Sequence, residues 1–306
     1  MSLRIRAEHR GPGRTVMHAA ILGGVAWNTM VDLGDFPSPH PHTLFADGMH
    51  RAVGSSGAGK ALNLASLGVE VDLWAMIGDD EPGARIRKRL NDAGVRFHGS
   101  IDPLGTAEHI NLMNRAGQRI SIFANPGSLS AMIDPEPMRS IIESADVVAV
   151  TILDHCRPFL PIAASAAGDL WIDLHDYDGA NQYHEEFIEA ADALIMSSVA
   201  MPDWRTFLED QVSGGKHVAI ATHGDDGAAA LTVDDGWVEV EAIPATVVDT
   251  NGAGDAFLAG FVVAWGSGAD LATAMRAGAQ HASLAVSSRE LAPRPRGHGA
   301  HEEPDS

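Results

Sequence analysis

The sequence of 306 residues predicts an α/β sandwich, with a central, mainly parallel sheet, helices on both faces and a small β-rich subdomain. Short apolar runs alternate with amphipathic stretches over residues 16–290, as in consecutive strand and helix units of a parallel sheet. Two sections, Thr29–Val53 and Val95–Phe123, instead alternate apolar and polar residues, which predicts the small subdomain. Residues 1–15 and 291–306 lack an apolar period, so we expect flexible ends.

Each predicted element follows from local pattern. Buried strands are expected where apolar runs are short and bounded by turn residues: Ala19–Val25, Val69–Ile77, Asp146–Val150, Leu170–Leu174, Ala193–Met196 and His217–Thr222. Helices are expected where apolar residues recur at helical spacing: Ala58–Leu67, Pro82–Ala93, Pro135–Ser144, Tyr183–Ala190, Gly254–Gly266 and Leu271–Val286. A hairpin is expected from Ala228–Val233 and Val238–Ala242.

Composition excludes several classes of function. A net charge of −20 repels phosphodiester backbones, so we expect no nucleic-acid partner. No apolar run approaches the roughly 18 residues that a membrane span needs, and the N-terminus lacks the apolar core of a signal peptide, so a cytoplasmic protein is expected. The single cysteine, Cys156, rules out an intrachain disulfide, and without an evident His or Asp partner we expect it to be inert.

The strongest motif is Asp249–Phe257, with the sequence DTNGAGDAF. Its small residues 252–254 allow a tight turn and leave backbone N–H groups free at the start of a helix, where the helix dipole favours an anion. Asp255 follows in the first turn, where a carboxylate can take a proton from an attacking hydroxyl. The alternative is that Asp255 only caps the helix. The flanking Asp249 and the small residues favour catalysis.

Two further Gly-rich segments indicate ligand binding. Residues 54–61 have the Walker A spacing, but Ala61 replaces the Mg²⁺-binding Ser or Thr and the preceding segment is polar, so a P-loop is disfavoured. Gly54 and Ser55 can instead offer backbone groups to a polar substrate. Residues 222–227 follow a predicted strand, and Thr222 can bind phosphate, although a plain turn explains them nearly as well. The 15 histidines show no metal-ligand spacing, and His281 can face either a nucleotide base or a partly exposed surface.

Taken in order, these segments resemble the pfkB, or ribokinase-like, family of carbohydrate and nucleoside kinases, over about residues 15–291. The family's C-terminal signature, Asp-Thr-x-Gly-Ala-Gly-Asp-x-Phe, is met at residues 249–257. Its N-terminal glycine signature is similar to residues 54–68, its Gly-Asp-Asp-x-x-Gly element to residues 78–83, and its nucleotide turn to residues 222–227. The resemblance implies a three-layer sandwich in which residues 29–53 and 95–123 form a lid over the sugar site.

The resemblance also implies an activity: ATP-dependent phosphorylation of a hydroxyl on a small sugar or sugar derivative, with Asp255 as general base. Mg²⁺ is expected to bridge the phosphates, and a monovalent cation such as K⁺ is expected near the backbone of Asp249. The implied anion hole comprises Gly252, Ala253 and Gly254. The implied substrate residues are Asn28, Asp32, Gly54 and Ser55, and the implied nucleotide residues are Thr222, Gly224, Gly227 and His281. An exposed edge of the lid sheet favours a homodimer.

Three departures from the family pattern keep alternatives open. Asn28 stands where the family has a substrate-binding Asp, and it can hold a hydroxyl but cannot act as a charged acceptor. Gly54-Ser55 and Gly59 replace the usual Gly-Gly and Asn. Residues 197–200, Ser-Ser-Val-Ala, replace the Asn-x-x-Glu that supports Mg²⁺, so we expect either that another acid such as Asp173 assists the metal or that turnover is slow. A nucleoside kinase and a non-catalytic sugar-binding relative are the alternative functions.

Overall fold

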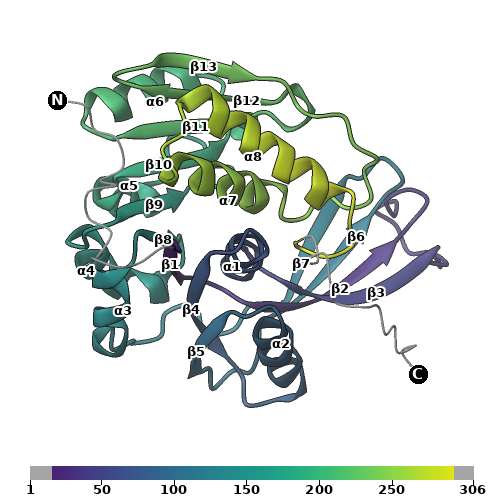
Figure 1. Cartoon of the computed structure of the whole chain (residues 1–306). Helices are drawn as coiled ribbons and strands as arrows, with labels where there is room; N and C mark the ends of the chain where they lie inside the picture. Colours follow the sequence, from purple (N-terminus) through teal and green to yellow (C-terminus); the bar gives the residue numbers. More distant parts are fainter. Residues whose placement is uncertain (1–15, 293–306) are drawn as a thin grey trace.

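A large, twisted sheet forms the centre of the molecule in the computed structural model, which describes residues 16–292 (Figure 1). Nine strands lie in the order β13-β12-β11-β10-β9-β8-β1-β4-β5. The pairs β11–β12 and β12–β13 are antiparallel, and all the other pairs are parallel. Their bounds, in that order, are Gly236–Val240, Ala228–Thr232, Val218–Thr222, Ala193–Ser197, Asp169–Asp173, Val147–Thr151, His18–Leu22, Glu70–Ile77 and Arg96–Ile101. A three-layer α/β fold is therefore confirmed.

Helices cover both faces of this sheet, which is why its inner strands are continuous apolar runs rather than alternating ones. One face packs against α1 (Ser56–Ser66), α2 (Glu81–Asp92), α7 (Ala253–Gly266) and α8 (Leu271–Val286). The other face packs against α3 (Arg139–Ser144), α4 (Leu160–Ala164), α5 (Glu185–Ala190) and α6 (Trp204–Ser213). Each face thus has its own apolar core.

A separate four-stranded sheet projects to one side of the main sheet (Figure 1). Its order is β3-β2-β6-β7, and the strands span Gly48–Gly54, Ala26–Asp32, Glu108–Met113 and Arg119–Asn125. Its pairs β2–β3 and β6–β7 are antiparallel, and β2–β6 is parallel. We call this sheet the lid.

Several predicted boundaries are corrected by the structure. The segment 95–123 was expected to belong entirely to the lid, but Arg96–Ile101 is β5, the half-exposed edge strand of the main sheet. Exposure on one side gives an edge strand the same alternating pattern as a lid strand. Helices α4 and α6 were not predicted. Leu291 and Ala292, assigned to the flexible tail, are buried in the core, whereas residues 1–15 and 293–306 lie outside the described residues.

Candidate active site

The start of α7 has the tight, glycine-containing turn that the motif predicted. Gly252 adopts a left-handed backbone conformation, with φ 79°, and the helix begins at the next residue. Within residues 16–292, the N–H groups of Gly252 and Gly254 have no hydrogen-bond partner, while that of Ala253 donates to the carbonyl of Thr250 at 3.4 Å. A side chain at position 254 would meet no atom within 4 Å. The turn therefore presents free N–H groups at an open helix N-terminus, an arrangement that suits a phosphoryl group.

The carboxylate of Asp255 lies in the first turn of this helix and contacts α1. Its Oδ1 accepts hydrogen bonds from the Ser56 hydroxyl at 2.8 Å and from the Lys60 ammonium at 2.6 Å. Its Oδ2 carries no hydrogen bond within the described residues. With 8% of its surface exposed, Asp255 is buried beside the free N–H groups of the turn. One of its oxygens is thus fixed, and the other is available.

Lys60 and Ser56 were not recognised as site residues from the sequence. Lys60 is 2% exposed, and its Nζ lies 2.8 Å from Oδ2 of Asp173, at the carboxyl end of β9. Burial alone would lower the pKa of Lys60, but Asp173 and Asp255 outweigh it and raise that pKa. The available signal was a lone lysine in a helix of otherwise small, apolar or uncharged residues, SGAGKALNLAS.

Asp173, expected to support Mg²⁺, is instead engaged by this ammonium. Burial opposes the charged form of Asp173, but His175 and Lys60 lower the pKa of its carboxyl to about 2. Asp173 is consequently a carboxylate at neutral pH and forms an ion pair with Lys60. Within residues 16–292, no group of three or more His, Cys, Asp or Glu side chains is arranged to hold a metal ion.

Three of the four predicted substrate residues, Asn28, Gly54 and Ser55, meet where the lid joins the main sheet. Asn28 on β2 is buried, and its Oδ1 has no hydrogen-bond partner within the described residues. A side chain at Gly54 would lie 2.1 Å from the Asn28 amide, so the close approach of β3 to Asn28 requires glycine there. Ser55 follows with φ 75° and ψ 152°, a conformation that residues other than glycine rarely adopt.

Asp32 lies apart from Asn28, at the far end of β2. It lines a cavity of about 200 Å³ between the lid and the loop that precedes α7, together with His50, Asn114, Asp249 and Arg289. Arg289 approaches Asp32 at 3.6 Å. Asp249 is buried there, and burial raises the pKa of its carboxyl. The lid contacts the same loop through Arg119 and Asn251, and through the Thr250 hydroxyl, which donates to the Gly117 carbonyl.

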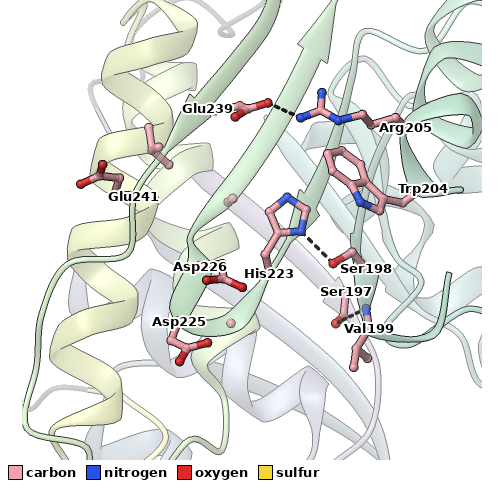
Figure 2. A pocket seen from close by; sticks show the side chains of 13 residues that line it. Ser197, Ser198, Val199, Trp204, Arg205, His223, Asp225, Asp226, Glu239 and Glu241 are labelled. Atoms are coloured by element: carbon pink, nitrogen blue, oxygen red, sulfur yellow. Dashed lines mark hydrogen bonds and ion pairs between the residues drawn. The ribbon is translucent and has the colours of Figure 1, made fainter. Parts of the chain in front are cut away.

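A larger cavity, of about 960 Å³, lies beside the predicted nucleotide turn (Figure 2). Gly224 and Ala228 line it, and Ser197 and Ser198, which replace the family's Asn-x-x-Glu, lie on its wall. Figure 2 shows His223 between the Ser198 hydroxyl, 2.7 Å from its Nδ1, and the ring of Trp204, with centroids 4.5 Å apart.

The other predicted nucleotide residues lie in or near this turn, with one exception. Thr222 ends β11, and Gly227, at φ 97°, passes so close to the Val240 carbonyl that a side chain there would lie 2.1 Å from it. His281, in contrast, is 6% exposed in the interface between α7 and α8, against Gly260. It does not line the cavity, and burial lowers its pKa. This burial contradicts the alternative expectation that His281 lies on a partly exposed surface.

Comparison with known proteins agrees with this arrangement. Residues 25–295 match the family described as pfkB family carbohydrate kinase. The chain belongs to the pfkB family. The match includes both glycine-rich segments, residues 54–61 and 222–227, and the α7 motif. This chain is therefore an ATP-dependent sugar or nucleoside kinase.

Individual relatives in the pfkB family act on different acceptors. The chain is 30% identical over 274 residues to the acarbose 7(IV)-phosphotransferase of Actinoplanes sp., covering 85% of this chain and 88% of that one. It is 27% identical over 277 residues to the nucleoside kinase of Methanothermobacter thermautotrophicus, covering 87% and 88%. Its structure superimposes on a microbiome-derived acarbose kinase with a TM-score of 0.81 and 29% identity, over 90% of this chain and 94% of that one.

Within residues 16–292, no helix combines the length and the apolar content that crossing a bilayer requires.

Proposed function

We propose that this kinase transfers the γ-phosphoryl group of ATP to a hydroxyl of a small sugar or sugar derivative, with Asp255 as general base. The observation that carries the proposal is the position of Asp255, whose free Oδ2 lies in the first turn of the helix that begins with the unpaired N–H groups. The substrate hydroxyl gives its proton to Asp255 as its oxygen attacks the γ-phosphorus. The N–H groups stabilise the charge on the transferred phosphoryl group.

The two substrates then approach from opposite sides of this turn. The sugar lies beneath the lid, against Asn28 and the backbone of Gly54 and Ser55, and the unpaired amide oxygen of Asn28 accepts a hydrogen bond from a sugar hydroxyl. ATP passes along residues 222–227, where Thr222 and the glycines of the turn allow close approach of the phosphates. Asp32 lines a separate cavity, where it contacts a more distant part of a larger sugar.

The side chains of this site do not fit a protein-held Mg²⁺ ion. Asp173 is paired with Lys60, and residues 197–200 provide two hydroxyls but no carboxylate. We therefore take magnesium to arrive as part of the substrate, bound to the phosphates of ATP, and we assign it no protein ligand. Binding of K⁺ near the backbone of the buried Asp249 is also proposed, and an assay of turnover with and without K⁺ tests it.

The test is ADP release from MgATP across a panel of monosaccharides, acarbose-type oligosaccharides and nucleosides, with the wild type and Asp255→Asn. We expect one class of sugar to trigger release and Asp255→Asn to lower kcat by about two orders of magnitude or more, with little change in ligand binding, because the amide cannot accept the proton. The control is Asp270→Asn at the N-terminus of α8, where asparagine caps as well as aspartate. Near wild-type turnover by Asp255→Asn would remove Asp255 from this role.

A nucleoside kinase is the second candidate, since a nucleoside kinase is among the relatives and Trp27 lies on β2 of the lid, where a ring can stack on a base. Release triggered by nucleosides and not by sugars would select it. A non-catalytic binding protein would instead show sugar-induced stabilisation against heat without any ADP release.

A further inference from the structure

A buried ammonium group lies at the centre of the site, and the proposed reaction does not yet use it. Lys60 projects from α1 between two carboxylates, 2.6 Å from Oδ1 of Asp255 and 2.8 Å from Oδ2 of Asp173. The Ser56 hydroxyl connects Lys60 to Asp255 a second time, because it accepts a hydrogen bond from Lys60 and donates one to Asp255. These contacts join α1, β9 and α7, three elements far apart in the chain.

The two carboxylates that contact Lys60 have different roles. Two carboxylates and one ammonium leave a single net negative charge in a region almost closed to solvent. Asp173 lies at the end of a fully buried strand, where its other oxygen accepts a hydrogen bond from the N–H of His175, and it lines neither the cavity beneath the lid nor the cavity beside residues 222–227. Asp173 therefore anchors the ammonium, and the ammonium in turn anchors Asp255.

The backbone of α1 is shaped for this contact. A side chain at Gly59 would lie 2.1 Å from Oδ2 of Asp255, so only glycine lets the carboxylate lie flat against the helix. With Oδ1 held by Ser56 and Lys60, Oδ2 is the one oxygen of Asp255 without a hydrogen bond in the described residues. Gly59 and Lys60 thus act together, one giving the carboxylate room and the other fixing its rotation.

We propose that Lys60 is a positioning residue for phosphoryl transfer: its ammonium, anchored by Asp173, holds Oδ1 of Asp255 so that Oδ2 faces the substrate hydroxyl. This inference rests on the proposed role of Asp255 as the base. Because Lys60 acts through Asp255 and touches neither substrate, its loss acts on kcat and leaves the KM for sugar and for ATP almost unchanged.

The decisive comparison uses Lys60→Met and the double variant Lys60→Met/Asp173→Asn. The single variant removes the ammonium that the buried carboxylates of Asp173 and Asp255 share, and it is expected to unfold more easily. The double variant removes both charges at similar side-chain volume and is expected to recover most of that stability. Chemical denaturation measures stability, and steady-state kinetics measures kcat and both KM values.

For the positioning role we expect kcat at least tenfold below wild type in the double variant, with each KM within about threefold. If Lys60 had only a structural role, the double variant would regain kcat as it regains stability. A double variant with kcat within twofold of wild type therefore overturns the proposal. A loss of kcat/KM that comes from a raised KM, and not from a lowered kcat, overturns it as well. Failure of Lys60→Met to fold leaves the double variant as the test.

Asp255→Asn, alone and combined with Lys60→Met/Asp173→Asn, separates this inference from the proposed function. If Lys60 acts only through Asp255, its loss lowers kcat no further once Asp255 is replaced. Substantial turnover by Asp255→Asn alone would defeat the proposed function, and this inference with it. An inactive Asp255→Asn beside a fully active double variant would defeat only the role of Lys60.

Discussion

At position 59, the absence of a side chain makes room for the buried carboxylate of Asp255. Alanine there would favour the helix by about 1 kcal/mol, but its Cβ would force the Asp255 carboxylate to rotate away from Lys60. We expect Gly59→Ala to lower kcat about tenfold or more and to lower the free energy of unfolding by about 1 to 3 kcal/mol, because the buried ammonium of Lys60 loses a carboxylate partner. Denaturant titration and steady-state kinetics on the same preparation measure both quantities.

A matched change elsewhere controls for the substitution itself. Gly214 ends α6 with φ −75°, a conformation that alanine adopts freely, and it lies far from the site. Gly214→Ala should leave kcat unchanged. If Gly59→Ala also retains full kcat, then the carboxylate of Asp255 tolerates rotation and its contact with α1 is not needed for turnover.

Among the elements, the lid is the least covered. Strand β7 forms its outer edge, and Ile120, Ile122 and Phe123 are each more than two-fifths exposed. An edge strand with exposed apolar side chains and unpaired backbone groups favours association with another sheet. We propose that two copies of the chain pair through their lids.

Analytical ultracentrifugation at micromolar concentration tests this pairing. We expect a dimer for the wild type and a monomer for Ile122→Lys, because a buried lysine at the interface would lack a partner. Leu284→Lys, on the exposed face of α8, serves as the control and should stay dimeric. A monomeric wild type, or a dimer that survives Ile122→Lys, would contradict the proposal.

The elements also show what a sequence can and cannot reveal. The α7 motif was predictable because residues 249–257 are contiguous and their turn chemistry is local. Lys60 was not, because its partners lie 113 and 195 residues away, and helical spacing does not tell which carboxylates approach a buried face. Strand β5 was assigned to the lid because a half-exposed edge strand alternates like a lid strand. Chemistry that depends on contiguous residues could therefore be predicted from the sequence, and contacts between distant residues could not.

For the molecule as a whole, one buried carboxylate links three strands at the end of the main sheet away from the site. Asp72 on β4 accepts hydrogen bonds from Arg96 and His98 on β5, and it lies 2.7 Å from Nε2 of His18 on β1. Burial opposes the charge, but these hydrogen bonds outweigh it and hold the pKa of Asp72 well below its ordinary value. The folded chain therefore binds a proton at Asp72 less readily than the unfolded chain.

Because the pKa of Asp72 is lower in the folded chain, the free energy of unfolding is expected to fall as the pH becomes acidic. The contribution of Asp72 is fully present above the unfolded pKa of about 3.9 and is lost as the pH falls below it. We expect Asp72→Asn to cost about 2 to 4 kcal/mol of unfolding free energy at pH 7, and the difference from wild type to shrink between about pH 4 and pH 2. Urea titrations at a series of pH values measure it.

Asp92→Asn is the comparison, because Asp92 pairs with Lys88 on the exposed face of α2. Such surface pairs contribute little, so this variant should differ from wild type by less than about 1 kcal/mol at every pH. A difference for Asp72→Asn that stays constant down to pH 2 would show that the hydrogen bonds, and not the charge of Asp72, stabilise the three strands.

The position of Cys156 gives the molecule an internal reporter. This single cysteine is fully buried in the core beneath α3 to α6, where burial raises the pKa of its thiol and keeps it protonated. A thiol reagent therefore reaches Cys156 only when the layer of α3 to α6 opens, and the rate of labelling reports the rate of that opening. Lys60 and Asp255 lie in the opposite layer. Labelling of Cys156 therefore measures local unfolding of one layer under the same conditions in which turnover is measured at the proposed site in the other.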